Sequence, residues 1–150
     1  MKTKIPPPIV ATLFALIMWG LDRLVPMDML SAGTTAVIVP VLILVGLGIM
    51  TLAMQRFRKA GTTVNPLDPS RASSLVSSGI FGRSRNPMYL GMLILLTAWA
   101  IWLGNAANVI TLYLFFSFMT RFQIKPEEEA LIKLFGEEYE AWCEKVSRWI

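Results

Sequence analysis

The chain has 150 residues, 55% of them hydrophobic, and its 14 lysines and arginines outnumber its 10 acidic residues. This length predicts one domain, and the hydrophobic share is too high for an ordinary soluble domain of this size. The sequence has no histidine and a single cysteine, Cys143. An internal disulfide, a cysteine metal cluster, a Ser-His-Asp triad and a histidine-ligated zinc or iron site are therefore excluded. Because the basic residues lie in loops between apolar segments, as in membrane proteins, we expect no nucleic-acid partner.

Two apolar segments come first along the chain. Residues 9–25 follow a basic, proline-rich start; the run is long for a secretory signal peptide and no Ala-x-Ala pattern follows it, so we interpret it as a membrane helix. Residues 34–54 form the second expected span, which at ~1.5 Å per residue reaches about 30 Å, enough to cross a bilayer core. Gly46 and Gly48 lack the preceding strand of a dinucleotide-binding motif, and we expect them to allow close helix packing.

A hydrophilic loop, residues 55–85, separates these spans from the next. Its basic residues far outnumber its one acid, so the positive-inside rule places it in the cytoplasm. Lys2 and Lys4 belong on the same side if two spans lie between. Turn dipeptides at Asn65-Pro66 and Asp68-Pro69 indicate a structured loop rather than a helix. A flexible linker is the alternative, but the proline content and short apolar anchors favour a loop that folds onto another part of the protein.

The loop ends at Asn86-Pro87. Asparagine is a good helix N-cap, and proline suits the first helical position, where a missing N–H costs nothing. A transmembrane helix is therefore expected to begin here. The free N–H groups of its first turn, with Arg83 and Arg85 beside them, would make a site for an anion. A cap and basic flanks are also what any membrane helix needs, so the spacing alone leaves both interpretations open.

The rest of the chain predicts two more spans and a surface helix. Residues 87–103 and 107–122 are the third and fourth spans, joined by a tight turn at residues 104–106 as an antiparallel hairpin. Over residues 126–149 apolar side chains recur at three- and four-residue steps, which predicts an amphipathic helix. It is too acidic for a polybasic membrane anchor. We expect it to pack over the cytoplasmic ends of the spans and to close a chamber with the preceding loop.

Three glutamates stand at the start of this helix. Negative charge is favoured there by the helix dipole, which accounts for all three equally. Helical geometry separates them, because Glu127 and Glu128 flank the apolar stripe centred on Leu131, whereas Glu129 points nearly opposite. A carboxylate aimed at a partly buried face is costly unless it meets a cation or a donor. We therefore predict functional roles for Glu127 and Glu128 and a solvated charge for Glu129.

Ordered blocks between Gly61 and Trp149 carry a resemblance to a known family. The blocks GTTVNP, LVSSGIF, SRNPMYLG and PEEEALIKLFGEEYEAW resemble the isoprenylcysteine carboxyl methyltransferase and phospholipid methyltransferase family of integral membrane enzymes. The resemblance implies S-adenosylmethionine as cofactor and a lipidic or amphiphilic acceptor. It also implies a set of cofactor-binding residues in the loop, at the start of the third span and at the acids: Ser73, Ser74, Leu75, Val76, Gly79, Phe81, Arg85, Asn86, Pro87, Met88, Tyr89, Glu127 and Glu128.

The chain departs from the family pattern at several positions. Phe81 stands where the family usually has tyrosine, so ring stacking remains possible but a hydroxyl contact does not. Asn86 stands where many members have histidine and cannot act as a base. Gln123 stands where members that methylate a prenylated cysteine have an arginine, which weakens the case for a carboxylate acceptor. Arg121 and Glu128 are the predicted catalytic residues; for Arg121 an ordinary interfacial arginine is an equal alternative.

The sequence thus predicts an all-α integral membrane protein, residues 1–150 forming a single domain, with four transmembrane helices and a C-terminal amphipathic helix over a cytoplasmic cofactor pocket. We expect it in a bacterial inner membrane, with both termini and the active site cytoplasmic. The predicted reaction is methyl transfer from S-adenosylmethionine to an isoprenylcysteine-like carboxylate, a phospholipid amine or a small lipophilic thiol. An NADPH-dependent enzyme resembling sterol reductases, which share an Asn-Pro-x-Tyr-x-Gly turn, is one alternative. A non-enzymatic membrane scaffold of the same fold is the other.

Overall fold

The computed structural model describes residues 5–27, 31–61 and 73–150 of the protein. Within these ranges every regular element is a helix. Lys2, Lys4 and the expected turns at Asn65-Pro66 and Asp68-Pro69 lie outside the described residues.

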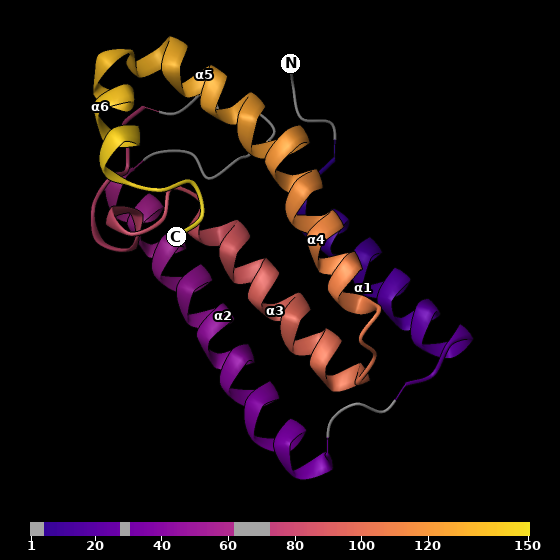
Figure 1. Ribbon diagram of the computed structural model, residues 1–150. Helices are drawn as coiled ribbons and strands as arrows, with labels where there is room; N and C mark the ends of the chain where they lie inside the picture. The colour runs from indigo at the N-terminus through magenta and orange to yellow at the C-terminus, as the bar shows by residue number, and fades with distance from the viewer. Residues whose placement is uncertain (1–4, 28–30, 62–72) are drawn as a thin grey trace.

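Four helices run side by side along the length of the molecule (Figure 1). They are α1 (Pro7–Leu24), α2 (Ala32–Ala60), α3 (Pro87–Leu103) and α4 (Asn108–Phe118). The central helix is α3, which packs against α1, α2 and α4. The start of α1, the end of α2, the start of α3 and the last two helices, α5 and α6, all lie at one end of this bundle. That end carries the candidate site.

Two helices, α1 and α2, are long and apolar enough to cross a membrane. Little of their surface is buried inside the protein, and large apolar side chains such as Leu16 (57% exposed), Val37 (67%) and Leu44 (71%) point outward. Apolar surface on this scale is what contact with lipid requires. The third helix, α3, is also apolar but shorter, and α4 has only 11 α-helical residues.

Helix α2 extends further than the sequence pattern predicted. The expected span ended near residue 54, whereas the helix continues to Ala60, so the first residues of the expected loop are helical. Arg58 and Lys59 lie in its last turn, where positive charge is favoured by the exposed carbonyl groups. The helix ends at Gly61, whose φ of 62° is a left-handed conformation that favours glycine. The two boundaries differ because the apolar run ends near residue 54, whereas the polar residues that follow it are still helical.

The turn between α3 and α4 is tight, as predicted, and the end of α1 holds it. Helix α3 ends at Gly104 with φ 69°. The Asn105 side chain then accepts a hydrogen bond from the Ala107 backbone N–H at 3.0 Å and donates one to the Val25 carbonyl at 2.6 Å. One buried amide therefore fixes the end of the hairpin against α1.

The last part of the chain forms two helices where one was expected over residues 126–149. Helix α4 continues through a π-helical segment, η3 (Met119–Ile124), into α5 (Lys125–Phe135), and α6 (Glu137–Lys145) follows. Gly136, with φ 54° and ψ −128°, separates α5 from α6 in a conformation that other residues rarely adopt. The residues after Lys145 leave the helix as an extended tail. The three- and four-residue spacing of apolar side chains does not reveal this break, because the spacing is the same in both helices.

The π-helical segment lies directly before a proline. Pro126 has no N–H to donate, and its ring would clash with the Phe122 carbonyl in a regular α-helix. A wider π turn relieves this conflict without ending the helix. It also turns Gln123 and Ile124 into the protein, where both are buried. The sequence did not predict this segment, because the expected fourth span ran through most of it as a regular helix.

The contact between α2 and α3 depends on two glycines. A Cβ atom at Gly46 would lie 3.0 Å from the Gly91 carbonyl oxygen, and one at Gly91 would lie 2.8 Å from the Gly46 oxygen. Close packing was expected at Gly46 and is confirmed there. At Gly48 it was wrong, since nothing lies within 4 Å of that position. Only one of the two glycines faces α3.

Gly91→Ala is expected to destabilise the protein. The added methyl group would lie 2.4 Å from the Met50 Cγ and against the Gly46 carbonyl, and overpacking of this kind costs about 1–3 kcal/mol. Gly48→Ala is the matched control in the same bundle and should be neutral or slightly stabilising, since alanine favours the helix over glycine. Thermal unfolding in detergent, followed by circular dichroism, measures both. Equal melting temperatures for Gly91→Ala and the wild type would contradict this packing.

Candidate functional site

A cavity of about 440 Å³ lies at the end of the bundle where α5 and α6 cross it. This volume is within the usual range of small-molecule sites, about 300–1,000 Å³. Its wall combines apolar and aromatic side chains with one arginine and two acids. The lining residues are Pro7, Pro8, Met54, Phe57, Ser74, Leu75, Val76, Phe81, Arg85, Asn86, Pro87, Met88, Tyr89, Met92, Glu127, Glu128, Leu131, Phe135, Tyr139 and Trp142.

The wall includes all but two of the predicted cofactor-binding residues. The two exceptions are Ser73 and Gly79. The Ser73 hydroxyl lies 3.5 Å from the Gly61 carbonyl at the end of α2, and Gly79 begins the 3-10 turn η2 (Gly79–Gly82) with φ 66°. Both residues shape the loop whose neighbours, such as Phe81, reach the cavity. The loop, the start of α3 and the acids of α5 are thus brought together although 38 positions separate Tyr89 from Glu127 in the sequence.

Glu127 is the acid at the centre of this arrangement. Its Oε1 accepts a hydrogen bond from the Tyr89 hydroxyl at 2.5 Å and another from the Gln123 side-chain amide at 2.6 Å. Gln123 also lies 3.4 Å from the Tyr89 hydroxyl oxygen. Two side chains, one from α3 and one from η3, therefore fix one carboxylate oxygen of α5. The inward turn of Gln123 in the π-helical segment makes this possible.

No basic side chain lies among the hydrogen-bond partners that hold Glu127. Burial raises the pKa of its carboxyl from 4.5 to about 7, and the negative charge of Glu128 adds to the increase, while the hydrogen bonds from Tyr89 and Gln123 oppose it. Burial disfavours the charged form because water no longer solvates it. A buried acid that titrates near neutral pH in a cavity is a functional-site candidate.

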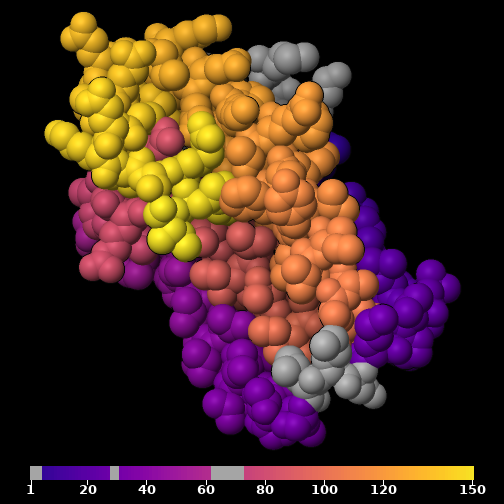
Figure 2. All heavy atoms as spheres, viewed as in Figure 1, coloured from indigo at the N-terminus to yellow at the C-terminus, as the bar shows by residue number. Residues whose placement is uncertain are grey.

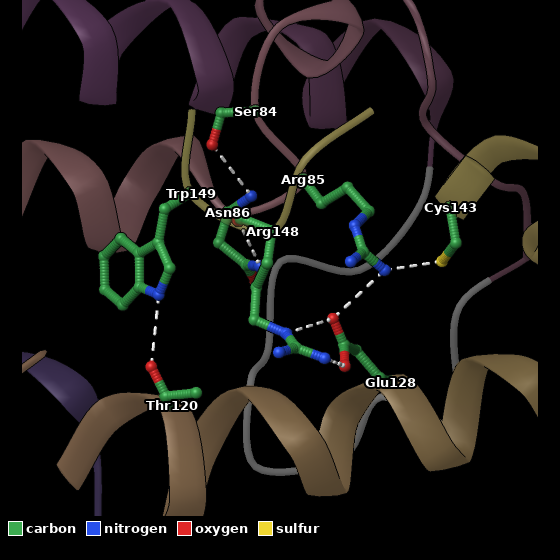
Figure 3. A network of polar contacts seen from close by, with 8 residues as sticks. All are labelled: Ser84, Arg85, Asn86, Thr120, Glu128, Cys143, Arg148 and Trp149. Carbon is green, nitrogen blue, oxygen red and sulfur yellow. Dashed lines mark hydrogen bonds and ion pairs between the residues drawn. The ribbon is translucent and has the colours of Figure 1, made fainter. Parts of the chain in front are cut away.

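Glu128 has the opposite environment, because two arginines neutralise it (Figure 3). The Arg148 Nε and Nη2 donate to its two oxygens at 2.9 and 2.7 Å, and the Arg85 Nη1 lies 3.1 Å from Oε1. The hydrogen bonds to Glu128 raise the pKa of Arg148 above its usual value. Arg85 also donates to the Cys143 sulfur. Cys143, for which the sequence indicated no role, therefore belongs to this polar network.

Asn86 occupies the predicted helix start but does not cap it with its side chain. Helix α3 begins at Pro87 as expected, yet the Asn86 amide forms no cap hydrogen bond. It donates instead to the Arg148 carbonyl at 2.9 Å. The capping prediction was wrong because a distant segment, the C-terminal tail, offers a carbonyl group at this place. The Asn86 side chain thus joins the start of α3 to the C-terminal tail.

The three glutamates separate in space as helical geometry predicted, and the functional roles of Glu127 and Glu128 stay predictions. Glu127 and Glu128 line the cavity, whereas Glu129 is exposed. Arg121, the predicted substrate-facing cation, is exposed and lies with its guanidinium 5.7 Å from the centre of the Phe122 ring. It is not among the residues of the cavity wall. A role for Arg121 at the membrane boundary stays a prediction, and within the cavity the cation is Arg85.

Helices α1 and α2 supply a part of the wall that the sequence did not predict. Pro7 and Pro8 of α1 and Met54 and Phe57 of α2 line the cavity. The Phe57 ring meets the Phe81 ring edge to face, with centroids 5.1 Å apart. Helical periodicity could have identified Phe57 as a wall residue. It lies one turn beyond Met54 on the same face of α2, a helix that continues past the expected boundary.

Two N–H groups of the wall have no partner in the described structure. They are the Arg85 Nε and the Trp142 Nε1, both buried. Leaving such donors unpaired costs free energy, so a bound molecule with acceptor atoms would be stabilised there. The cavity can therefore attract a cation at Glu127, meet acceptor atoms at Arg85 and Trp142, and pack aromatic rings against a planar group.

Comparison with known proteins identifies a family. A sequence model of the phospholipid methyltransferase family matches residues 34–138. An uncharacterised protein of Haemophilus influenzae (strain ATCC 51907 / DSM 11121 / KW20 / Rd) is 41% identical over 63 residues, which is 42% of this chain and the full length of that protein. Solved structures give no match. The family match includes every lining residue except Pro7, Pro8, Tyr139 and Trp142.

The unliganded protein is expected to lose stability as the pH rises from about 4.5 to 7. The pKa of Glu127 is 4.5 in the unfolded chain and about 7 in the folded protein. The stability that this difference contributes is therefore complete below the unfolded pKa and is lost as the pH rises through the folded pKa. The loss is on the order of 3 kcal/mol. Unfolding in detergent between about pH 5 and pH 8 measures it. Glu127→Gln should remove this slope and Glu129→Gln, at an exposed site, should keep it; the reverse pattern would contradict the assignment.

Proposed function

The chain belongs to the phospholipid methyltransferase family, and from that premise we propose that it transfers a methyl group from S-adenosylmethionine to a membrane-embedded or amphiphilic acceptor. The family implies a methyltransferase that acts on lipid-like substrates; the methyl donor and the acceptor are the proposed parts. The observation that supports the donor most directly is Glu127, whose carboxylate lines a largely apolar cavity and meets no basic side chain among the described residues.

The residues of the cavity fit the chemical groups of this donor. Ionised Glu127 would attract its positive charge. The rings of Phe57, Phe81 and Trp142 line the wall and would pack against the adenine base. The unpaired N–H groups of Arg85 and Trp142 would donate to its oxygen and nitrogen acceptors. Each class of ligand atom therefore has a side chain of suitable chemistry.

The work of the protein in such a reaction is positioning. When bound, S-adenosylmethionine supplies a methyl group already activated by a positively charged sulfur. The cavity residues then have to orient the two reactants and exclude water. Glu127 suits this task because Tyr89 and Gln123 hold it in one orientation. The absence of histidine from the chain does not conflict with a reaction that needs little acid–base chemistry.

The apolar part of the wall indicates where the acceptor would bind. Met54 of α2 and Met88 and Met92 of α3 line the cavity on the side that continues into the apolar bundle. Methionine side chains adapt to ligands of irregular shape, so they would accommodate the apolar part of an amphiphilic acceptor. A phospholipid amine, an isoprenylcysteine-like carboxylate and a small lipophilic thiol all meet this description.

We also propose the membrane arrangement that this function requires. Helices α1 and α2 cross the membrane, and α3 and the continuous helix formed by α4 and η3 cross it as a hairpin. The whole chain then forms one domain with the cavity on the cytoplasmic side of a bacterial inner membrane. The basic residues at the end of α2, Arg56, Arg58 and Lys59, support this orientation, since positive residues favour the cytoplasmic side.

S-Adenosylhomocysteine is expected to bind the detergent-solubilised protein, as measured by isothermal titration calorimetry. Glu127→Gln should weaken binding at pH 8 at least tenfold, because a charged hydrogen bond is worth about 1.5–3 kcal/mol. Glu129→Gln is the matched control and should bind like the wild type. In a parallel thermal-shift assay NADPH should leave the melting temperature unchanged. Stabilisation by NADPH alone would favour the reductase alternative, and binding of neither ligand would favour a scaffold.

The affinity for S-adenosylhomocysteine should also depend on pH. Its amino group stays positively charged near neutral pH, so it favours ionised Glu127, whose pKa in the unliganded protein is about 7. Below that value affinity should fall about tenfold for each pH unit, and above it affinity should level off. Titrations over about pH 5 to pH 8 test this. In Glu127→Gln the dependence should disappear; an equally steep dependence in this variant would assign it to another group.

A further inference from the structure

The last five residues of the chain connect three parts of the candidate site. The Arg85 backbone N–H donates to the Ser147 carbonyl at 3.0 Å, and Asn86 donates to the Arg148 carbonyl at 2.9 Å. On the other side the Trp149 indole donates to the Thr120 hydroxyl at 3.1 Å. Figure 2 shows this segment in yellow, seated between the loop before α3 and the helix that runs from α4 into α5.

Arg148 reaches into this junction from outside the cavity. It is not among the lining residues, yet its guanidinium forms two parallel hydrogen bonds with Glu128, whose side chain is only 12% exposed. Such a bidentate pair fixes the carboxylate in one plane and is stronger than a single contact. The tail anchors the arginine on both sides of that contact, through Asn86 and Trp149 (Figure 3).

The charge of this cluster affects the neighbouring acid. Glu128 carries one negative charge, and Arg85 and Arg148 carry two positive charges, so the cluster has a net charge of one positive. The groups that face Glu127 directly are Tyr89 from α3, Gln123 from η3 and Glu128 from its own helix. Of these only Glu128 is charged at neutral pH. The two arginines therefore decide how strongly Glu128 opposes the ionisation of Glu127.

We propose that Arg148 is a positioning residue of the methyl-donor site: by holding and neutralising Glu128 it leaves Glu127 as the one uncompensated acid that faces the donor. The assignment of the ligand rests on the proposed function. The assignment of Glu128 as the neutralised acid and of Glu127 as the uncompensated acid rests on the contacts alone. Arg85 cannot do this by itself, because it meets Glu128 through one nitrogen and also donates to Cys143.

The test is the ionisation midpoint of Glu127 in the unliganded folded protein, read as the pH at which the loss of stability levels off. In Arg148→Gln the cluster becomes neutral, and the midpoint should move to higher pH by about one unit. The affinity for S-adenosylhomocysteine at pH 7 should fall about fivefold to tenfold as a result. Arg148→Lys keeps the charge and should leave the midpoint near that of the wild type, although it loses the two parallel hydrogen bonds.

The double variant Arg148→Gln/Glu128→Gln separates charge from structure. It removes one positive and one negative charge, so the cluster returns to one positive and the midpoint should return to the wild-type value. Lys145→Gln is the matched control, since Lys145 is an exposed basic residue three positions away and its loss should change neither measurement. A midpoint that stays unchanged in Arg148→Gln, or that the second substitution does not restore, would overturn the proposal.

Failure of the proposed function would give a different result. If S-adenosylhomocysteine does not bind the wild type, the assignment of the methyl donor is wrong, whereas the midpoint still decides whether Arg148 controls Glu127. If the midpoint moves as expected but the affinity of Arg148→Gln at pH 7 equals that of the wild type, the cluster controls the acid but is not a part of the donor site, and the proposal fails.

Discussion

The candidate site depends on one partly buried hydrogen bond, from the Tyr89 hydroxyl to the Glu127 carboxylate. It joins the first turn of α3 to the first turn of α5, and so joins the helical bundle to the helices that cross its end. A buried carboxylate is costly without donors, and here Tyr89 and Gln123 supply two of them. The same contact therefore closes the fold at this end and holds the acid that gives the cavity its chemistry.

Two adjacent acids acquire different properties because different elements surround them. Glu128 faces the loop and the tail, where Arg85 and Arg148 neutralise it. Glu127 faces the bundle, where its partners are a hydroxyl and an amide. A helix places consecutive side chains about 100° apart. The Glu128 carboxylate therefore faces basic side chains, whereas the Glu127 carboxylate faces a nearly neutral part of the wall. The site thereby combines a satisfied ion cluster with a single acid that can respond to a positively charged ligand.

Three irregular features of the described residues bring side chains to this acid and its neighbours. The π-helical segment turns Gln123 inward, Gly136 lets the chain fold back so that α6 brings Tyr139 and Trp142 to the cavity, and the extended tail carries Arg148 to Glu128. The four bundle helices, by contrast, are regular along most of their length. Departures from regular helix geometry often mark functional sites, and here each one brings a side chain to the cavity wall or to an acid that lines it.

The sequence by itself determined the helical class, the start of α3 at Pro87 and the tight turn at the end of α3. It also determined the outward direction of Glu129 and the family. These features follow from apolar periodicity, from proline and glycine chemistry and from local motifs. Only the tertiary structure decided the partner of Asn86, the break at Gly136 and the roles of Phe57 and Arg148. The physical reason is range: periodicity and capping act within one or two turns, whereas a buried polar group takes whichever donor or acceptor the packed chain brings to it, and Asn86 and Arg148 meet across 62 positions.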